Sequence, residues 1–318
     1  MSFWRDKRVV VTGGAGFIGS HVVEALKEEG CQDIVIVRRR DYDLTKEGDV
    51  IRLFEEAHPE VVLHLAGLVG GILANKQRPA DFFYQNITMG TFVLHYAWRY
   101  GVEKVVSAAA GCGYPEYAPM PLKEESFWDG FPQQASFPYS LAKRMLHIQS
   151  LAYYQQHGFI SVVAIPGNVY GPYDNFDLNA SHVVPALVRK FVDAVECEDE
   201  EVIVWGSGQP TRDFVYAGDV ARGMLLAGEK CNEPELLNIS SGVETKIREL
   251  VELISELTGF QGKIVWDTSR PDGQLRRLFD ISRARHKLGF EPQADLREGL
   301  QRTIAWYKQN KAVARLVE

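Results

Sequence analysis

Short apolar runs and longer amphipathic stretches alternate along the first half of the chain. Runs rich in Val and Ile predict buried strands, and stretches with apolar residues three or four positions apart predict helices that cover them. Strands are expected at 7–12, 34–37, 61–65, 104–109 and 161–165, and helices at 18–29, 49–57, 81–100 and 138–157. Because strands and helices alternate, we expect an α/β fold with a doubly wound parallel sheet covered on both faces.

Beyond position 170 the pattern is less regular. Helices are expected at 183–195, 246–257 and 296–310, and short strands near Val202 and Ile264. No internal repeat or low-complexity linker divides the chain. We therefore expect a smaller α/β lobe after the parallel sheet, and one return of the chain to that sheet around 213–227.

Composition and charge narrow the class of protein. The 318 residues are 46% apolar, enough for a sizeable core, and 42 acidic against 35 basic residues give a formal charge of -7. Lys and Arg are scattered, so nucleic acid is not expected as a partner. Because no apolar run reaches about eighteen residues and no leader precedes the first strand, we expect a cytoplasmic protein without a membrane span.

The four cysteines, at positions 31, 112, 197 and 231, are far apart in the sequence. They include no Cys-x-x-Cys pair, which argues against a metal site or a disulfide scaffold. Reduced thiols and no metal are therefore expected.

A glycine-rich turn separates the first strand from the first helix. Its glycines are Gly13, Gly14, Gly16 and Gly19. Between a strand and a helix, this spacing allows a tight turn, a close approach of a pyrophosphate and a free helix N-terminus that stabilises the phosphate charge. We expect a Rossmann-like dinucleotide site here; the alternative is a glycine-rich turn without a ligand.

The end of the second strand indicates which dinucleotide binds. NAD enzymes place an acidic residue about twenty positions after the glycines, but this strand ends in Arg38, Arg39 and Arg40. Guanidinium groups bind a 2′-phosphate as bidentate donors, so NADP is favoured over NAD. Asp41 keeps NAD open, and some of these arginines could simply be solvated.

Tyr139 and Lys143 lie four residues apart in a predicted helix, so their side chains share one face. With the glycine turn upstream, this Tyr-x-x-x-Lys pair resembles the catalytic pair of short-chain dehydrogenase/reductases. In that interpretation Lys143 lowers the pKa of the phenol and holds the nicotinamide ribose, and Tyr139 exchanges a proton with the reacting hydroxyl. The alternative is a packed tyrosine with a surface lysine.

Further segments resemble the GDP-L-fucose synthases, which are extended short-chain dehydrogenase/reductases. The matching segments are Val69–Asn75, Pro79–Asn86, Cys112–Pro115, Pro138–Tyr139, Asn168–Pro172, Asp174–Phe176, Ser181–Leu187 and Arg270–Gly273. They span nearly the whole chain, in both the sheet and the smaller lobe.

The resemblance implies a two-stage reaction in one pocket. A GDP-linked 4-keto-6-deoxy sugar is inverted at carbons 3 and 5, and NADPH then reduces carbon 4 while Tyr139 protonates the oxygen. The family uses a cysteine and a histidine as the acid and base of the inversion, matching Cys112 and His182. Both groups can titrate near neutral pH when their surroundings shift them. From residue type alone, each is more often a buried structural residue.

The resemblance also implies binding residues. Those for the NADP cofactor are Gly13, Gly16, Phe17, Ile18, Gly19, Arg38, Arg39, Asp43, Leu44, Leu65, Ala66, Ala110, Tyr139, Lys143, Pro166, Asn168, Val169 and His182. Those for the nucleotide sugar are Asn168, Lys190, Trp205 and Arg212, with Asp272 a weaker candidate. The expected NADP-binding Rossmann domain covers 1–170 and about 213–228, and the nucleotide-sugar lobe covers 171–212 and 229–318. A homodimer through 83–96 and 139–157 is expected.

One position departs from the family. GDP-L-fucose synthases carry Ser or Thr two residues before the cysteine, where this chain has Ala110. Ser107 has the opposite side-chain parity and should not reach the same point. Loss of a donor to a developing oxyanion typically costs on the order of 10² to 10³ in rate. Three explanations remain open: an alteration that slows turnover, chemistry that relies on the epimerase half, or a substrate hydroxyl or water that fills the role.

The sequence leaves three functions to separate. The first is an NADPH-consuming epimerase/reductase on a GDP-linked hexose or a related heptose. The second is a redox-neutral nucleotide-sugar epimerase, and the third is a non-catalytic NADP-binding sensor. The identity of the base depends on the resemblance alone.

Overall fold

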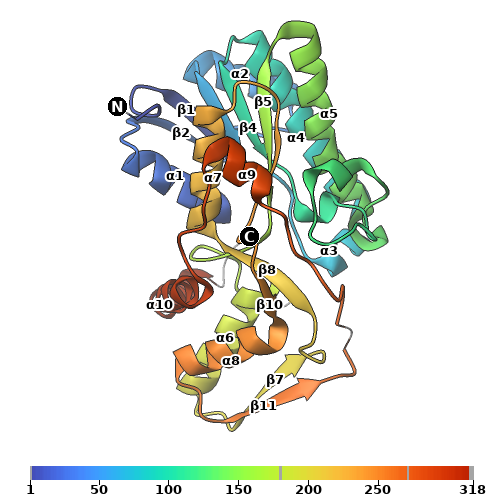
Figure 1. Ribbon diagram of the computed structural model, residues 1–318. Helices are drawn as coiled ribbons and strands as arrows, with labels where there is room; N and C mark the ends of the chain where they lie inside the picture. The colour runs from blue at the N-terminus through green and yellow to red at the C-terminus, as the bar shows by residue number, and fades with distance from the viewer. Residues whose placement is uncertain (1, 179–180, 271, 315–318) are drawn as a thin grey trace.

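A six-stranded parallel sheet forms one half of the computed structural model, which describes residues 2–178, 181–270 and 272–314 (Figure 1). The strand order is β2-β1-β3-β4-β5-β9. The strands are β1 (Arg8–Thr12), β2 (Asp33–Val37), β3 (Val61–His64), β4 (Lys104–Ala108), β5 (Ile160–Pro166) and β9 (Leu236–Ile239). The predicted doubly wound parallel sheet is confirmed.

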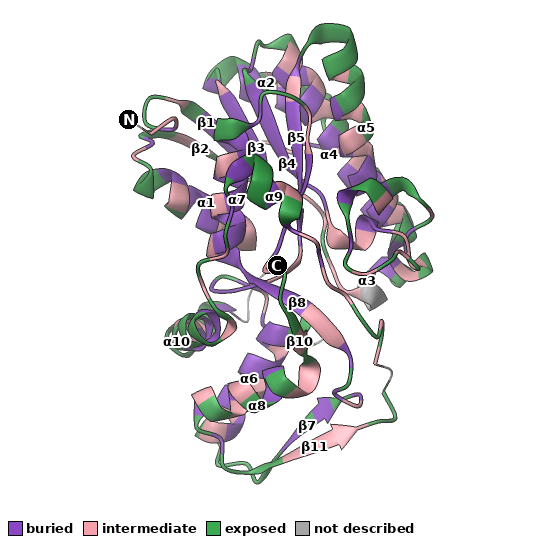
Figure 2. Ribbon diagram, in the orientation of Figure 1, coloured by how far each residue is buried: buried purple, intermediate pink, exposed green. Residues whose placement is uncertain are grey.

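Helices cover both faces of this sheet. They are α1 (Phe17–Glu28), α2 (Glu47–Ala57), α4 (Pro79–Arg99), α5 (Phe137–His157), α7 (Ala217–Lys230) and α9 (Ser282–Leu288), and the short α3 (Ile72–Gln77) packs against α4. Alternate side chains of β1 enter opposite layers, with Val9 and Val11 in the core under α1 and α7 and Val10 in the core under α2 and α4. Figure 2 accordingly shows β3 and β4, at the centre of the sheet, as buried strands.

In the described residues, the smaller lobe has two small sheets and three helices. Strands β6 (Asn168–Tyr170), β8 (Thr211–Tyr216) and β10 (Glu244–Lys246) form one sheet, and β7 (Glu201–Trp205) and β11 (Lys263–Asp267) form the other. The helices are α6 (Val183–Glu196), α8 (Ile247–Thr258) and α10 (Leu296–Ala314). Phe191, Ile254 and Tyr307 belong to a separate core between these elements.

Three short 3₁₀ turns occupy the long connection between β4 and α5: η1 (Gly111–Gly113), η2 (Glu124–Trp128) and η3 (Gln134–Ser136). The first of them carries Cys112. None of the described helices is both long and apolar enough to cross a membrane.

The return of the chain to the large sheet differs from the expectation. The returning strand is β9, which pairs with β5 and lies inside 229–318, a range expected to belong entirely to the smaller lobe. Within the expected 213–227 segment, β8 joins the three-stranded sheet, and only α7 packs beside α1 on the large one. β9 escaped prediction because it is only four residues long and includes the polar Asn238.

Candidate active site

The glycine turn adopts a shape that other residues would block. Gly13 has φ +70°, and a Cβ there would lie 2.8 Å from the backbone nitrogen of Ala66. A Cβ at Gly19 would lie 2.0 Å from the carbonyl oxygen of Gly13. Helix α1 then starts after Gly16 with no side-chain cap and no acidic residue in its first turn. The turn and the uncapped N-terminus fit the pyrophosphate of a dinucleotide.

Buried hydrogen bonds fix the strand ends beside this turn. The Thr12 hydroxyl lies 2.8 Å from His64 Nδ1 and accepts the backbone N–H of Ala66 at 3.2 Å. Burial, followed by the charge of Lys143, lowers the pKa of His64 to about 3, so this ring is neutral. Leu65 and Ala66 are thereby held against the glycine turn, where cofactor contacts were expected.

The arginines after β2 are solvent-exposed. Arg38 and Arg39 are available for a 2′-phosphate, whereas Arg40 lies 3.4 Å from Asp41. The Asp43 carboxylate accepts the backbone N–H and hydroxyl of Thr45, so it stabilises its own loop. Leu44 is buried in the core under α2.

Tyr139 and Lys143 lie in the first two turns of α5 and are 8% and 4% exposed. The Lys143 ammonium donates to the carbonyl oxygen of Ala108 at 3.2 Å. Burial raises the pKa of Tyr139 above its ordinary value, and the charge of Cys112 adds to this. Burial also lowers the pKa of Lys143 to about 8. The expected lowering of the tyrosine pKa by Lys143 is therefore not found, because desolvation of the phenol dominates.

Cys112 lies in the same site as the tyrosine and lysine. Its charge acts on Tyr139, Lys143 and Arg144, all on α5. Ala110 is half-buried at the start of the same 3₁₀ turn. Ser107 is fully buried, and its hydroxyl has no hydrogen-bond partner among the described residues. Ser107 therefore does not replace the missing hydroxyl at 110.

The remaining residues expected at the cofactor lie where β5 passes into the smaller lobe. Pro166 ends β5 and is buried. Asn168 donates to the carbonyl oxygen of Asp213 at 2.9 Å, and Val169 packs against the core under α1. His182 immediately precedes α6, and its side chain is exposed at the surface. The protein around the ring nevertheless desolvates it, which lowers the pKa of His182.

Lys190 and Trp205 meet in the smaller lobe. The Lys190 ammonium lies 5.2 Å from the indole centroid and donates to the carbonyl oxygen of Ile203 at 2.9 Å. Arg270, which was not among the predicted binding residues, lies 5.0 Å from the same centroid. Because Trp205 is 58% exposed, its ring is available to a ligand.

Arg212 and Asp272 are placed differently. Arg212 is half-buried on β8, and its pKa is lowered by burial and then by the neighbouring Arg277. The Asp272 carboxylate accepts the Ser207 N–H at 2.6 Å and the Ser207 hydroxyl at 2.7 Å, so it closes the turn between β7 and β8. Pro271 of the Arg270–Gly273 segment lies outside the described residues.

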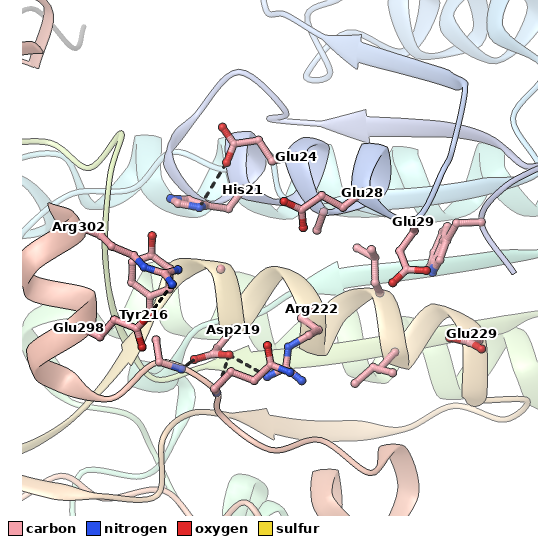
Figure 3. Close-up of a pocket in the computed structure, with 17 residues that line it drawn as sticks. His21, Glu24, Glu28, Glu29, Tyr216, Asp219, Arg222, Glu229, Glu298 and Arg302 are labelled. Carbon is pink, nitrogen blue, oxygen red and sulfur yellow. Dashed lines mark hydrogen bonds and ion pairs between the residues drawn. The ribbon is translucent and has the colours of Figure 1, made fainter. Parts of the chain in front are cut away.

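A pocket of about 480 Å³ lies elsewhere, between α1, α7 and α10 (Figure 3). In Figure 3, Glu24 points toward His21, and Asp219 pairs with Arg222 at 2.8 Å. Within the described chain, no residue predicted for catalysis or binding lines this pocket. It is therefore separate from the candidate active site.

The sequence patterns missed one residue that contacts the turn Gly111–Gly113, here called the reaction turn. Arg277 donates from Nη2 to the carbonyl oxygen of Gly111 at 2.5 Å, across 166 positions. It belongs to no motif and lies in an irregular connection, so only the folded chain shows the contact.

The parallel sheet carries a glycine turn before the uncapped helix α1, a buried Tyr-x-x-x-Lys pair lies on α5, and a second lobe follows the strand ends. These features define an extended short-chain dehydrogenase/reductase. The NAD dependent epimerase/dehydratase family matches residues 9–240. The chain belongs to this family and, within it, to the GDP-L-fucose synthases.

Similarity to individual relatives extends over nearly the whole chain. GDP-L-fucose synthase 1 of Arabidopsis thaliana is 39% identical over 306 residues, covering 96% of this chain and 94% of the relative. GDP-L-fucose synthase of Escherichia coli is 34% identical over 314 residues, covering 96% and 98%. The structure of GDP-L-fucose synthetase from Naegleria fowleri bound to NADP has a TM-score of 0.92 at 29% identity, covering 99% of this chain and 96% of that one.

Proposed function

We propose that the protein is an NADPH-dependent epimerase/reductase that converts a GDP-linked 4-keto-6-deoxy sugar to a product of the GDP-L-fucose type. The observation that carries this proposal is the packing of η1, which carries Cys112, against α5, which carries Tyr139 and Lys143, where Lys143 donates to Ala108 at the end of β4. The names of the relatives support the nucleotide and the sugar, and the structural relative bound to NADP supports the cofactor.

The larger half is proposed to hold the dinucleotide. The backbone N–H groups at Phe17, Ile18 and Gly19 would bind the pyrophosphate, and Arg38 and Arg39 the 2′-phosphate. Bound NADPH would supply the hydride for carbon 4. Lys143, with a pKa of about 8, is mostly charged at neutral pH and would hold the nicotinamide ribose through its remaining donors.

Tyr139 is proposed as the acid for reduction. Because burial raises its pKa, the phenol is protonated at neutral pH and can donate to the oxygen on carbon 4. Cys112 and His182 are proposed as the pair that inverts carbons 3 and 5. The ketone acidifies the C–H bonds at both carbons, so one group removes a proton and the other returns one to the opposite face of the ring.

The smaller lobe is proposed to hold the nucleotide. Trp205 offers an exposed ring face, and Lys190 and Arg212 supply cations for the diphosphate. Asp272 is proposed as an indirect contributor, because its carboxylate already closes the Ser207 turn. Asn168 would contact both the cofactor and the sugar from the boundary between the lobes.

Two other functions have an observation in their favour. Ala110 favours a non-catalytic NADP sensor, because the hydroxyl expected beside Tyr139 is absent. A GDP-6-OMe-4-keto-L-xylo-heptose reductase from C. jejuni, with a TM-score of 0.88 at 28% identity over 97% of this chain, favours a heptose. The joint presence of Tyr139, Lys143, Cys112 and His182 argues against the sensor.

NADPH absorbance separates these functions. With GDP-4-keto-6-deoxymannose, we expect one NADPH oxidised for each product molecule, identified by NMR as inverted at carbons 3 and 5. Product without net oxidation would favour the redox-neutral epimerase, and a faster reaction with the heptose would favour that substrate. No turnover with any nucleotide sugar would favour the sensor.

We also infer a cytoplasmic homodimer. Phe83 and Tyr84 on α4, with Ile148 and Leu151 on α5, are exposed apolar side chains on two helices that pack side by side. All four cysteines are free thiols, as a reducing compartment would keep them. Light scattering is expected to give twice the mass of the chain, and Ile148→Glu with Leu151→Glu is expected to give monomers.

A further inference from the structure

A segment of the smaller lobe reaches back to the turn that carries Cys112. Residues 275–280, here called the connecting segment, run from the small sheets toward α9. The backbone N–H of Thr211 donates to the Leu275 carbonyl at 2.9 Å, and that of Arg277 donates to the Thr211 carbonyl at 3.1 Å. These two hydrogen bonds with Thr211, the first residue of β8, fix the position of the connecting segment.

Two side chains of this segment hold the turn at Gly111. Arg277 donates to the Gly111 carbonyl at 2.5 Å, directly before Cys112. The Phe279 ring lies so close that a Cβ at Gly111 would be 2.7 Å from its Cζ. The connecting segment therefore helps to fix the backbone of the reaction turn, together with β4 and α5.

Within the described part of the chain, no carboxylate is among the groups that act on the charge of Arg277. Burial lowers the pKa of its guanidinium, and negative charge on Cys112 or Tyr114 counters this. Its Nε is buried and has no hydrogen-bond partner among the described residues. The nearby Arg212 is another cation. Arg277 is half-buried, and the carbonyl that it holds directly precedes Cys112, so its charge lies next to the turn that carries this reactive residue.

We propose that Arg277 is a positioning residue for Cys112, holding the Gly111 carbonyl with one arm of its guanidinium and facing the sulfur with its charge. The proposal rests on the proposed function. In the inversion, a C–H bond beside the ketone breaks, its electron pair passes to the ketone oxygen, and a proton returns to the carbon from the other face. Arg277 supports this proton transfer, whereas protonation of carbon 4 oxygen by Tyr139 does not depend on it.

Solvent deuterium exchange measures the proton step separately. The full-length protein with NADP⁺ is incubated with GDP-4-keto-6-deoxymannose in D₂O, and NMR follows deuterium entering carbons 3 and 5. Without NADPH no net reduction occurs, so the exchange is measured apart from hydride transfer. Because reduction follows inversion, single-turnover NADPH oxidation is started from substrate that the unaltered protein has already brought to its inversion equilibrium, with thermal melting as the check of folding.

We expect Arg277→Gln to slow the exchange by about 10²-fold, the order of loss for a displaced catalytic group, and to slow NADPH oxidation by much less. Arg277→Lys keeps the charge but has a single ammonium in place of the guanidinium fork. Its exchange rate should therefore lie between those of Arg277→Gln and the unaltered protein. Arg276→Gln is the matched control, because the neighbouring Arg276 is exposed and pairs with Glu244 at 2.8 Å. It should exchange within about twofold of the starting protein, the small effect expected of an exposed pair.

The outcomes separate this inference from the proposed function. No exchange by the unaltered protein would reject the proposed function itself. Exchange by the unaltered protein together with a normal rate in Arg277→Gln, or equal losses of exchange and reduction, would overturn the role of Arg277. If Arg277→Gln does not fold, Arg277→Lys decides: an exchange rate equal to that of the unaltered protein overturns the proposal, and a selective loss supports it.

Discussion

The Tyr139–Lys143 pair of α5 and the smaller lobe hold their candidate functional side chains in opposite ways. Tyr139 and Lys143 are 8% and 4% exposed, whereas Trp205 is 58% exposed with two cations over its ring. Burial shifts the pKa values at the first site, so its residues are prepared for proton transfer. The exposed ring at the second is available for contact. Substitutions should therefore change the rate at the first site and the affinity at the second.

The strongest test of this contrast is Tyr139→Phe. Tyr139 is the group proposed to give a proton to the carbon 4 oxygen, so loss of its hydroxyl should lower the rate of NADPH oxidation by about 10² to 10⁴-fold. The affinities for NADPH and the nucleotide sugar, measured by calorimetry, should change little because the ring remains. A variant that keeps more than a tenth of the rate would show that another acid acts here.

The next largest effect is expected at Ala110. Ala110→Ser restores a donor beside Tyr139, and such a donor to a developing oxyanion is worth on the order of 10² to 10³ in rate. We expect Ala110→Ser to accelerate single-turnover NADPH oxidation by that order. Deuterium exchange at carbons 3 and 5 is measured in parallel, because proton removal there also places charge on the carbon 4 oxygen.

The outcome at Ala110 also separates the three explanations for it. No gain would favour a substrate hydroxyl or a water in the missing position. A gain confined to reduction would show that the present chain relies on its epimerase half or is slowed at this position. Ala109→Ser is not a suitable control, because Ala109 is buried. Ser126→Ala is suitable, because Ser126 is half-buried and its hydroxyl donates to the Lys123 carbonyl in its own turn.

The same contrast separates what the sequence could predict from what it could not. The glycine turn and the pair in α5 are contiguous motifs, so spacing and local pattern predicted them, with element ends within a few residues. The short β9 was missed because its four residues carry too little pattern. The family match supplied Trp205 and Lys190, but Arg270 and Arg277 contact the site through long side chains from an irregular segment. Such contacts depend on tertiary packing and leave no periodic signal.

On the substrate side, Trp205→Ala should weaken nucleotide binding. Stacking of a base on an aromatic ring is worth about 1 to 3 kcal/mol, so the Kd for GDP should rise on the order of 10-fold or more. The Kd for NADPH and the rate at saturating substrate should be unchanged. Tyr117→Ala is the matched control, since Tyr117 is an aromatic side chain 91% exposed on the connection before α5. Equal losses in both variants would contradict a specific role for Trp205.

The smallest effect, in the pH dependence of NADPH binding, tests the cofactor side. Burial gives Lys143 a pKa of about 8, and ribose oxygens and phosphates raise that pKa in the complex because they favour the charged ammonium. Below pH 8 the Lys143 ammonium is already charged in the free protein, so the affinity for NADPH is at its maximum. Above pH 8 a proton must be taken up on binding, so the Kd should rise about tenfold from pH 7 to 9.

Fluorescence titration of NADPH across this pH range checks the prediction, with Lys143→Met as the comparison. The variant should bind NADPH more weakly at pH 7 and show a flat profile, because the titrating group has been removed. The exposed Arg38 and Arg39 keep their charge throughout the range and cannot produce the slope. An equal slope in Lys143→Met would assign the proton uptake to another group and would remove the pKa argument for the buried pair.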